Sequence, residues 1–356
     1  MTKLLLTILG NALWNPDMKE KIPSSAFSSL MAIADKQAVV GFVLDGIGGF
    51  QEADAPKDDL FEYIGIQSDI TQDNGLLNRE VAQFARTCKE HKIEYIVVKG
   101  QLMAKLYPHP ELRMPGDIDF LIKEKYTECK GDVEKAFGVA LPKKLIEKEI
   151  AFNRGLFVYE LHGKLIEFGK KKHQQYWDSL MAHVWDTPFY ETINEEKVRT
   201  LSPTVNAVYL FLHIFTHFIR GGIGLRQFCD WAVCLKYYEK DVDHCKVQEI
   251  LEELDLQYAY GAFGTILVDK LGLPVSSFPM NIADSHRKWT NMILDDIFRG
   301  GNLGRYNHNC KHPLLYKFES VGLVIRNTFR YYRLAPSEMC MVIPQMIKIN
   351  LRLLFS

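Results

Sequence analysis

The most constraining feature of the chain is a short apolar segment that carries two aspartates, GDIDFLI at residues 116–122. Alternate residues of a β-strand face opposite sides, so Asp117 and Asp119 share one face, about 7 Å apart. Ile118 and Phe120 then point into the core. Burying unpaired charge is costly, and a cation is therefore expected opposite the two acids. The segment predicts a buried strand beside a metal site or a basic group.

A second apolar strand and a glycine turn precede the aspartates. The strand is predicted over Ile93–Val98 and ends at Lys99 and Gly100, and a helix is expected over Gln101–Tyr107. A strand followed by a glycine and a helix start gathers backbone N–H groups at a positive helix end, which suits an anion. Lys99 adds a positive charge. Without the downstream acids, the same residues would indicate an ordinary turn with Lys99 in solvent.

A two-metal phosphoryl-transfer site needs a third carboxylate from a neighbouring strand. A hairpin is predicted from Leu156–Leu161 and Lys164–Phe168, joined by a two-residue His-Gly loop. Pairing position 161 with position 164 places Glu160 and Glu167 on one face. Glu167 lies between two apolar residues and is the better candidate, with Glu160 as the alternative.

Helical periodicity dominates the chain on both sides of these strands. The expected fold class is α+β, with a small mixed sheet in residues 91–200 between an N-terminal helical region, 1–90, and a C-terminal helical domain, 201–356. A helix that opens at Pro203 carries His213 and His217 at the margin of its apolar stripe. On the next helix, Arg226 and Asp230 are four residues apart and are expected to pair as a scaffold for a cleft wall.

Composition narrows the function classes. The formal net charge of −1 provides no overall positive field, and nucleic acid is not an expected partner. Seven cysteines at scattered spacing favour free thiols in a reducing, cytoplasmic compartment over a disulfide framework. No run of eighteen apolar residues is present, and no membrane-spanning helix is predicted.

The C-terminal end is basic. Residues 301–356 contain eight Lys and Arg against two Glu, and Arg326, Arg330 and Arg333 recur on one helical face. Such a segment could make weak contact with a membrane surface or hold an anionic acceptor. A pair of capping helices with solvated arginines is the favoured interpretation.

Two blocks of sequence resemble a known family. KGQLMAKLYPHPELRMPGDIDFLI, at residues 99–122, and LSPTVNAVYLFLHIFTHFIRGGIGLRQFCDWAVCL, at residues 201–235, resemble a little-characterised bacterial nucleotidyltransferase family of the DNA polymerase β-like superfamily. The resemblance spans roughly residues 1–240. It implies a mixed sheet on which an Asp-x-Asp pair and a third strand carboxylate hold two Mg²⁺ ions, while a small-residue turn receives a triphosphate.

The resemblance assigns roles to individual residues. Asp117, Asp119 and Glu167 are the implied metal-binding and catalytic carboxylates. The implied nucleotide-binding residues, with ATP as the expected nucleotide, are Lys99, Gly100, Gln101, Arg113 and Gly116. Gln101 stands where the superfamily has Ser or Gly.

The predicted reaction moves a nucleoside monophosphate from a nucleoside triphosphate to an acceptor hydroxyl. The acceptor could be a small molecule, a sugar or a protein side chain, and it is expected against the helices that carry His213, His217 and Arg226. An alternative, motivated by Gln101, is an inactive nucleotidyltransferase fold that binds a nucleotide or a partner. A metal-dependent nuclease ranks last because the chain lacks a basic groove with interleaved aromatic residues.

Overall fold

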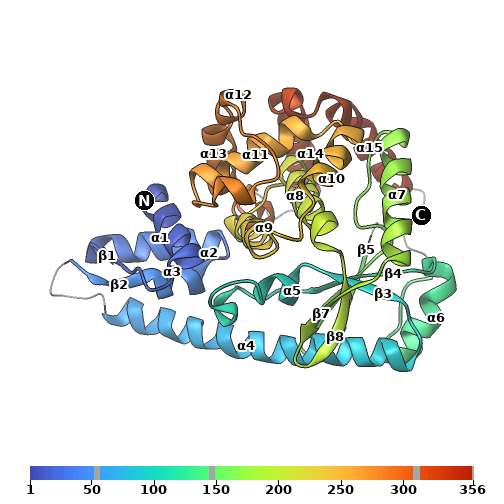
Figure 1. Ribbon diagram of the computed structural model, residues 1–356, viewed down its shortest axis with the longest axis horizontal. Helices are drawn as coiled ribbons and strands as arrows, with labels where there is room; N and C mark the ends of the chain where they lie inside the picture. The colour runs from blue at the N-terminus through green and yellow to red at the C-terminus, as the bar shows by residue number, and fades with distance from the viewer. Residues whose placement is uncertain (52–56, 144–148, 308–312, 355–356) are drawn as a thin grey trace.

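A computed structural model describes residues 1–51, 57–143, 149–307 and 313–354. A small four-stranded sheet lies between a long helix, α4 (Lys57–Glu90), and a C-terminal half made largely of helices (Figure 1). The predicted α+β class is confirmed. The predicted region boundaries near residues 90 and 200 fall where α4 ends and where strand β8 (Glu196–Thr200) ends.

The N-terminal region contains helices and one unexpected pair of strands. Its remaining elements are α1 (Thr2–Trp14), β1 (Glu20–Ile22), η1 (Ser24–Ala26), α2 (Phe27–Lys36), α3 (Val40–Gly46) and β2 (Ile47–Phe50), with β1 and β2 parallel. The sequence predicts helical structure up to about residue 90, with one helix starting near Asn74, whereas α4 is continuous from Lys57. The added turns are supported by tertiary contact, since the ring of Tyr63 packs edge-on against Phe27 of α2.

The central sheet is mixed, with the strand order β3-β4-β6-β5. Strands β4 and β6 are parallel, and the other two pairs are antiparallel. The elements of this region are β3 (Tyr95–Val98), α5 (Gly100–Ala104), η2 (Pro110–Leu112), β4 (Ile118–Ile122), α6 (Tyr126–Phe137), β5 (Glu149–Arg154) and β6 (Phe157–His162).

The predicted hairpin is wrong, and the sheet order explains why. Strand β6 pairs with β5 on one side and with β4 on the other, so it has no free edge for residues 164–168. The hairpin turn lies earlier, at Gly155, whose φ of +60° suits glycine. Residues after His162 leave the sheet, and Glu167 is not on a strand.

One face of the sheet is covered by an aromatic cluster. Phe84 of α4 is fully buried, and its ring centroid lies 4.8 Å from that of Phe120 on β4 and 5.1 Å from that of Tyr95 on β3. Phe137 of α6 stacks on Phe84, and Tyr159 of β6 closes the cluster. Because aromatic rings fill this face, Asp119 of β4 points to the opposite face.

The C-terminal half covers the aspartate face (Figure 1). It follows α7 (Lys171–Asp186) and the hairpin of β7 (Phe189–Ile193) with β8. Its helices are α8 (Pro203–Arg220), α9 (Leu225–Tyr237), α10 (His244–Glu253), α11 (Gln257–Asp269), η3 (Val275–Ser277), α12 (Asp284–Arg287), α13 (Thr290–Gly300), η4 (Asn302–Gly304), α14 (Pro313–Arg330), η5 (Tyr332–Leu334) and α15 (Pro336–Leu354). Among the described residues, none of the helices combines the length and apolar character of a membrane span.

The basic C-terminal segment is used at least partly inside the molecule. Arg326 and Arg330 of α14 lie 3.9 Å and 3.5 Å from the carboxylate of Asp296 on α13, which is 7% exposed. These contacts favour the capping interpretation. Weak membrane-surface contact stays a prediction, because the side chains of Lys348 and Arg352 lie outside the described part of the chain.

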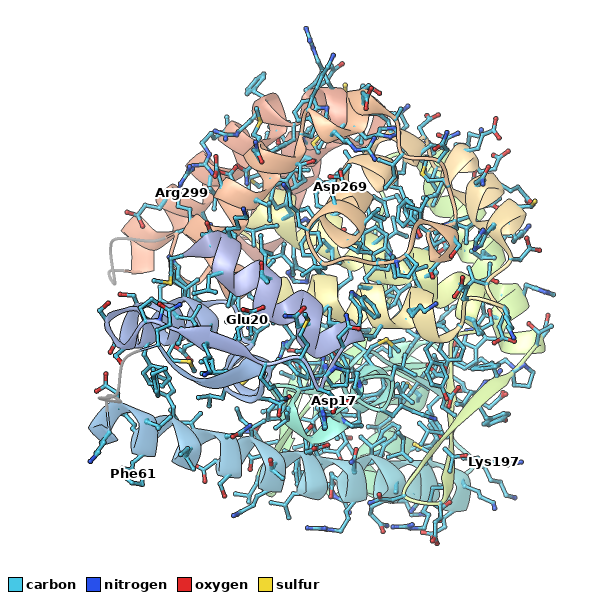
Figure 2. All side chains as sticks on the ribbon, turned by 60° about the vertical axis from the view of Figure 1, so that its left-hand side comes forward. Asp17, Glu20, Phe61, Lys197, Asp269 and Arg299 are labelled. Atoms are coloured by element: carbon cyan, nitrogen blue, oxygen red, sulfur yellow. The ribbon has the colours of Figure 1, made fainter. Side chains whose placement is uncertain are left out.

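The aromatic cluster gives a test of the fold. We expect Phe84→Ala to lower the free energy of unfolding by about 3–5 kcal/mol, because it removes a fully buried ring and leaves a cavity. Phe61→Ala is the matched control on the same helix, since Phe61 is 73% exposed and points outward (Figure 2). Urea unfolding measures both values, and equal losses would contradict the packing described here.

Candidate active site

Asp117 and Asp119 line a polar pocket of about 190 Å³ between the sheet and the C-terminal helices. The sheet contributes Asp119, Glu160 and His162, Asp117 directly precedes β4, and the turn after β3 contributes Lys99 and Gly100. The opposite wall comes from α8 and α9 and includes Tyr209, His213, His217, Arg226 and Asp230. The structure therefore brings together most of the residues that the sequence singles out.

Strand pairing places two carboxylates side by side. Asp119 of β4 is directly opposite Glu160 of β6 in the parallel register. One ligand atom from each of Asp119, Glu160 and His162 lies within 4.8 Å of the other two. Such a group of oxygen and nitrogen ligands is compatible with a metal ion.

Asp119 is the most buried acid of the pocket, at 2% exposure, and it has two basic partners. Its Oδ1 lies 2.9 Å from Lys99 Nζ and 2.7 Å from His162 Nε2. Burial would raise the pKa of Asp119, but Lys99 and His162 lower it on balance. In the same way, burial would lower the pKa of Lys99, but the charge of Asp119 raises it. The cation expected opposite the aspartates is thus Lys99.

Glu160 has the opposite electrostatic environment. Burial, together with the negative charges of Asp117, Asp119 and Glu149, raises the pKa of Glu160 to about 8. The pocket therefore has more carboxylate charge than its bases neutralise. Crowded carboxylates of this kind are typical of sites that bind a cation or share a proton.

His162 of β6 contacts acids on both neighbouring parts of the sheet, Asp119 on β4 and Glu149 on β5. Its Nδ1 lies 3.2 Å from Glu149 Oε2 on β5, while Nε2 faces Asp119 on β4. Burial would lower the pKa of His162, but its contacts with Asp119 and Glu149 raise it on balance. Sequence reasoning did not assign His162 or Glu149 to the site. A usable signal was present, because His162 lies two residues after Glu160 and so shares its strand face.

The turn after β3 has an unusual backbone. Lys99 and Gly100 both have positive φ, +58° and +49°, and the position of a Cβ on Gly100 would lie 3.4 Å from the carbonyl oxygen of Asp117. This conformation directs Lys99 into the pocket and starts α5 beside Asp117. The side chain of Gln101 turns away, since its Nε2 donates to the Oδ1 atoms of Asn74 and Asn78 on α4 at 3.2 and 2.7 Å. Gln101 therefore leaves the pocket side of the turn clear.

The two arginines have other partners than the sequence predicts. Arg113 is buried and forms a bidentate pair with Asp230, with Nε–Oδ1 at 2.7 Å and Nη2–Oδ2 at 2.8 Å, while its Nη1 donates to Met114 O. The expected pairing of Arg226 with Asp230 is wrong, because Arg113 occupies that carboxylate. Arg226 Nη1 instead donates to the carbonyl oxygens of Met114 and Pro115. Among the described residues, no ion pair joins Arg226 to a carboxylate.

Glu167 lies outside the active-site pocket. It is exposed and lines a separate small cavity with Arg220 and Glu338. The prediction that Glu167 shares the aspartate face is wrong, because it depended on a strand at 164–168 that does not form. Glu160, the alternative acid, occupies the neighbouring position on the sheet.

Comparison with known proteins identifies a family. A family described as uncharacterised nucleotidyltransferase matches residues 23–271, more than half of the chain. The chain belongs to this family. It is also similar to the crystal structure of an antigenic nucleotidyltransferase-like protein from Paracoccidioides brasiliensis, at 16% identity and a TM-score of 0.32. That similarity covers 55% of this chain and 92% of the other. A search of curated proteins finds no match.

The raised pKa of Glu160 predicts a pH dependence of stability. A carboxyl group with a higher pKa in the folded state than in the unfolded state binds its proton more tightly when folded. Its contribution to stability is therefore lost as pH rises from about 4.5 toward 8. Without divalent ions, we expect Glu160→Gln to match the parent near pH 5. Near pH 9 Glu160→Gln should be more stable than the parent by about 2 kcal/mol. This difference is smaller than the full pKa shift would give, because Glu160 is partly exposed. Equal thermal unfolding curves at high pH would contradict this expectation.

The Arg113–Asp230 pair gives a second prediction. We expect Asp230→Asn to lower the free energy of unfolding by about 3–5 kcal/mol, because it leaves the buried Arg113 charge uncompensated. Asp269→Asn is the control for an Arg–Asp pair that is more exposed, with Arg287, and should cost at most about 1 kcal/mol. Denaturant unfolding distinguishes the two, and a small loss for Asp230→Asn would contradict a supporting role of the pair.

Proposed function

We propose that the protein transfers a nucleoside monophosphate from a nucleoside triphosphate, with ATP as the expected nucleotide, to an acceptor hydroxyl. The observation that carries this proposal is the convergence of Asp117, Asp119 and Glu160 on one pocket that ends at the Lys99-Gly100 turn. Membership of a nucleotidyltransferase family supports the same reaction. The sequence pattern further supports a place in the DNA polymerase β-like superfamily.

The three carboxylates suit divalent cations. Their oxygens are the ligands that Mg²⁺ prefers, and the raised pKa of Glu160 reflects negative charge that a cation would neutralise. We assign Asp117, Asp119 and Glu160 as the residues that would hold two Mg²⁺ ions. When bound, Mg²⁺ would neutralise phosphate charge and lower the pKa of the acceptor hydroxyl.

The remaining residues bind and orient the substrates. Lys99 and the backbone of Gly100 would hold the β- and γ-phosphates at the start of α5, because donors and positive charge meet there. Arg226 is proposed as the nucleotide-binding arginine in place of Arg113. The three guanidinium nitrogens of Arg113 already donate to Asp230 and to Met114 O. His162 would hold Asp119 in position.

A second candidate function has one specific observation in its favour. Asp119 Oδ1 already contacts Lys99 and His162, so metal binding at that atom requires Lys99 to exchange partners. A chain in which this exchange does not occur would bind a nucleotide or partner without turnover.

Nucleotide binding tests the main proposal. In the presence of Mg²⁺, we expect ATP to raise the melting temperature of the parent protein in a concentration-dependent way. Asp117→Asn and Glu160→Gln should weaken this binding at least about tenfold, because each removes a charged ligand. Glu167→Gln is the matched control, an acid outside the pocket, and should bind as the parent does.

The outcomes separate the two functions. Metal-dependent release of pyrophosphate that Asp117→Asn abolishes supports a transferase. Equal nucleotide affinity in all three variants would contradict the proposed site. Tight binding without pyrophosphate release, in assays that supply sugars and small hydroxyl compounds as acceptors, would favour the inactive binding protein.

A further inference from the structure

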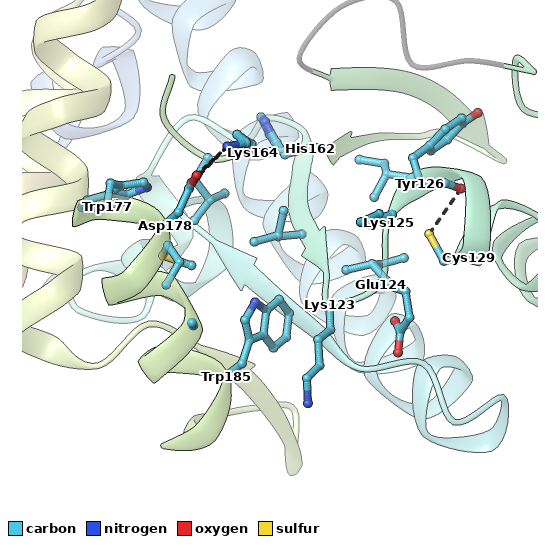
Figure 3. A pocket seen from close by; sticks show the side chains of 17 residues that line it. Lys123, Glu124, Lys125, Tyr126, Cys129, His162, Lys164, Trp177, Asp178 and Trp185 are labelled. Atoms are coloured by element: carbon cyan, nitrogen blue, oxygen red, sulfur yellow. Dashed lines mark hydrogen bonds and ion pairs between the residues drawn. The ribbon is translucent and has the colours of Figure 1, made fainter. Parts of the chain in front are cut away.

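A second cavity adjoins the active-site pocket at the C-terminal ends of β4 and β6. Its volume is about 570 Å³, against about 190 Å³ for the carboxylate pocket. His162 and Leu165 line both of them. We call it the α7 cavity, because Trp177, Met181 and Trp185 of that helix form one of its walls (Figure 3).

The α7 cavity has the size and lining of a small-molecule site. Ligand pockets are typically about 300–1,000 Å³, mostly apolar and aromatic, with a few polar groups. Here Leu121 and Leu161 line the cavity from the sheet, and Tyr126 and Cys129 line it from α6 (Figure 3). Burial raises the pKa of the Cys129 thiol to about 11, so it acts as an apolar group and not as a nucleophile.

Charged side chains lie only around the mouth of the cavity. Lys164 pairs with Asp178 at 2.8 Å, and Lys123 pairs with Glu94 at 2.8 Å. Lys125 makes no ion pair with another described residue. Glu124 also lines the cavity and is exposed, so the charges at its mouth do not favour an anionic ligand over a neutral one.

The position of the cavity fits the geometry of phosphoryl transfer. The Gly100 turn lies beside Asp117 at the start of β4, the carboxylate pair is at Asp119, and the α7 cavity begins at Leu121. Leu121 is two positions after Asp119, about 7 Å further along the strand. In phosphoryl transfer, the attacking and leaving oxygens lie roughly in line through phosphorus. If pyrophosphate leaves toward Gly100, the attacking oxygen approaches from the side of the α7 cavity.

We propose that the α7 cavity binds the acceptor, a small molecule with an aromatic or apolar body and a hydroxyl group directed toward Glu160. This inference rests on the proposed function. The hydroxyl oxygen forms a bond to the α-phosphorus of the nucleoside triphosphate, and the bond from that phosphorus to the pyrophosphate oxygen breaks. The hydroxyl proton passes to water, and pyrophosphate leaves on the side of Lys99. The cavity does not suit a long polysaccharide or a nucleic acid.

The dye 8-anilino-1-naphthalenesulfonate is a suitable probe, because it combines aromatic rings with one anionic group. We expect the full-length protein to bind it, with a fluorescence increase on direct excitation of the dye. Ala182→Trp places a large side chain at the exposed mouth of the cavity and should weaken binding at least about tenfold. His183→Trp is the matched control, because it adds the same residue at the next exposed position of α7, outside the lining.

The same titrations with saturating Mg²⁺ and ATP decide which ligand the cavity takes. Simultaneous binding of dye and nucleotide supports an acceptor site. Displacement of the dye by ATP would overturn the proposal, because the cavity would then hold the nucleobase. Failure of the parent to bind the dye, or equal dye affinity in Ala182→Trp and His183→Trp, would also overturn it. A melting-temperature titration with Mg²⁺ and ATP, but without the dye, tests the proposed function separately. Its failure is therefore distinguished from failure of the α7 cavity as a ligand site.

Discussion

The buried carboxylate of Asp119 imposes the main physical constraint on this structure. A carboxylate at 2% exposure is stable only with charged or hydrogen-bonding partners, and here Lys99 and His162 supply them. Lys99 reaches Asp119 because the turn after β3 adopts positive φ at two successive residues. His162 reaches it because β6 is parallel to β4 and in the matching register. The turn, the strand order and the register together place Lys99 and His162 beside the carboxylate of Asp119.

The walls of the pocket are tied together by a second set of buried polar contacts. Asp230 of α9 accepts from Arg113 and from the hydroxyl of Tyr107, at 2.7 Å each, so it links the loop before β4 to the C-terminal helices. Arg226 fixes the next residues of the same loop through their carbonyl oxygens. Because these contacts span more than one hundred residues, the position of Asp117 depends on both halves of the chain. This arrangement pre-organises the pocket before any ligand binds.

Charge and apolar surface change along a single strand. The start of β4 meets the Lys99-Gly100 turn, its middle carries the carboxylates, and its end reaches the α7 cavity. Burial, together with the negative charge in the middle, raises the pKa of Glu160. A reaction that joins an anionic triphosphate to an apolar acceptor would use these three environments in that order, which is why we treat the two cavities as parts of one site.

Local patterns in the sequence were enough to predict the α+β class, the strands that became β3 and β4, and the shared face of Asp117 and Asp119. Strand periodicity and glycine turns depend on neighbouring residues, so they are visible without a fold. The choice between Glu160 and Glu167 was different, because it required knowing that β6 has β4 on one side and β5 on the other. The same limit applies to Arg113 and Arg226, whose partners are distant in sequence. The sequence by itself determined which residues carry the chemistry of the aspartate strand and its turn. Only the tertiary structure decided which distant acid, histidine and arginine complete the site, because strand order and helix packing set those distances.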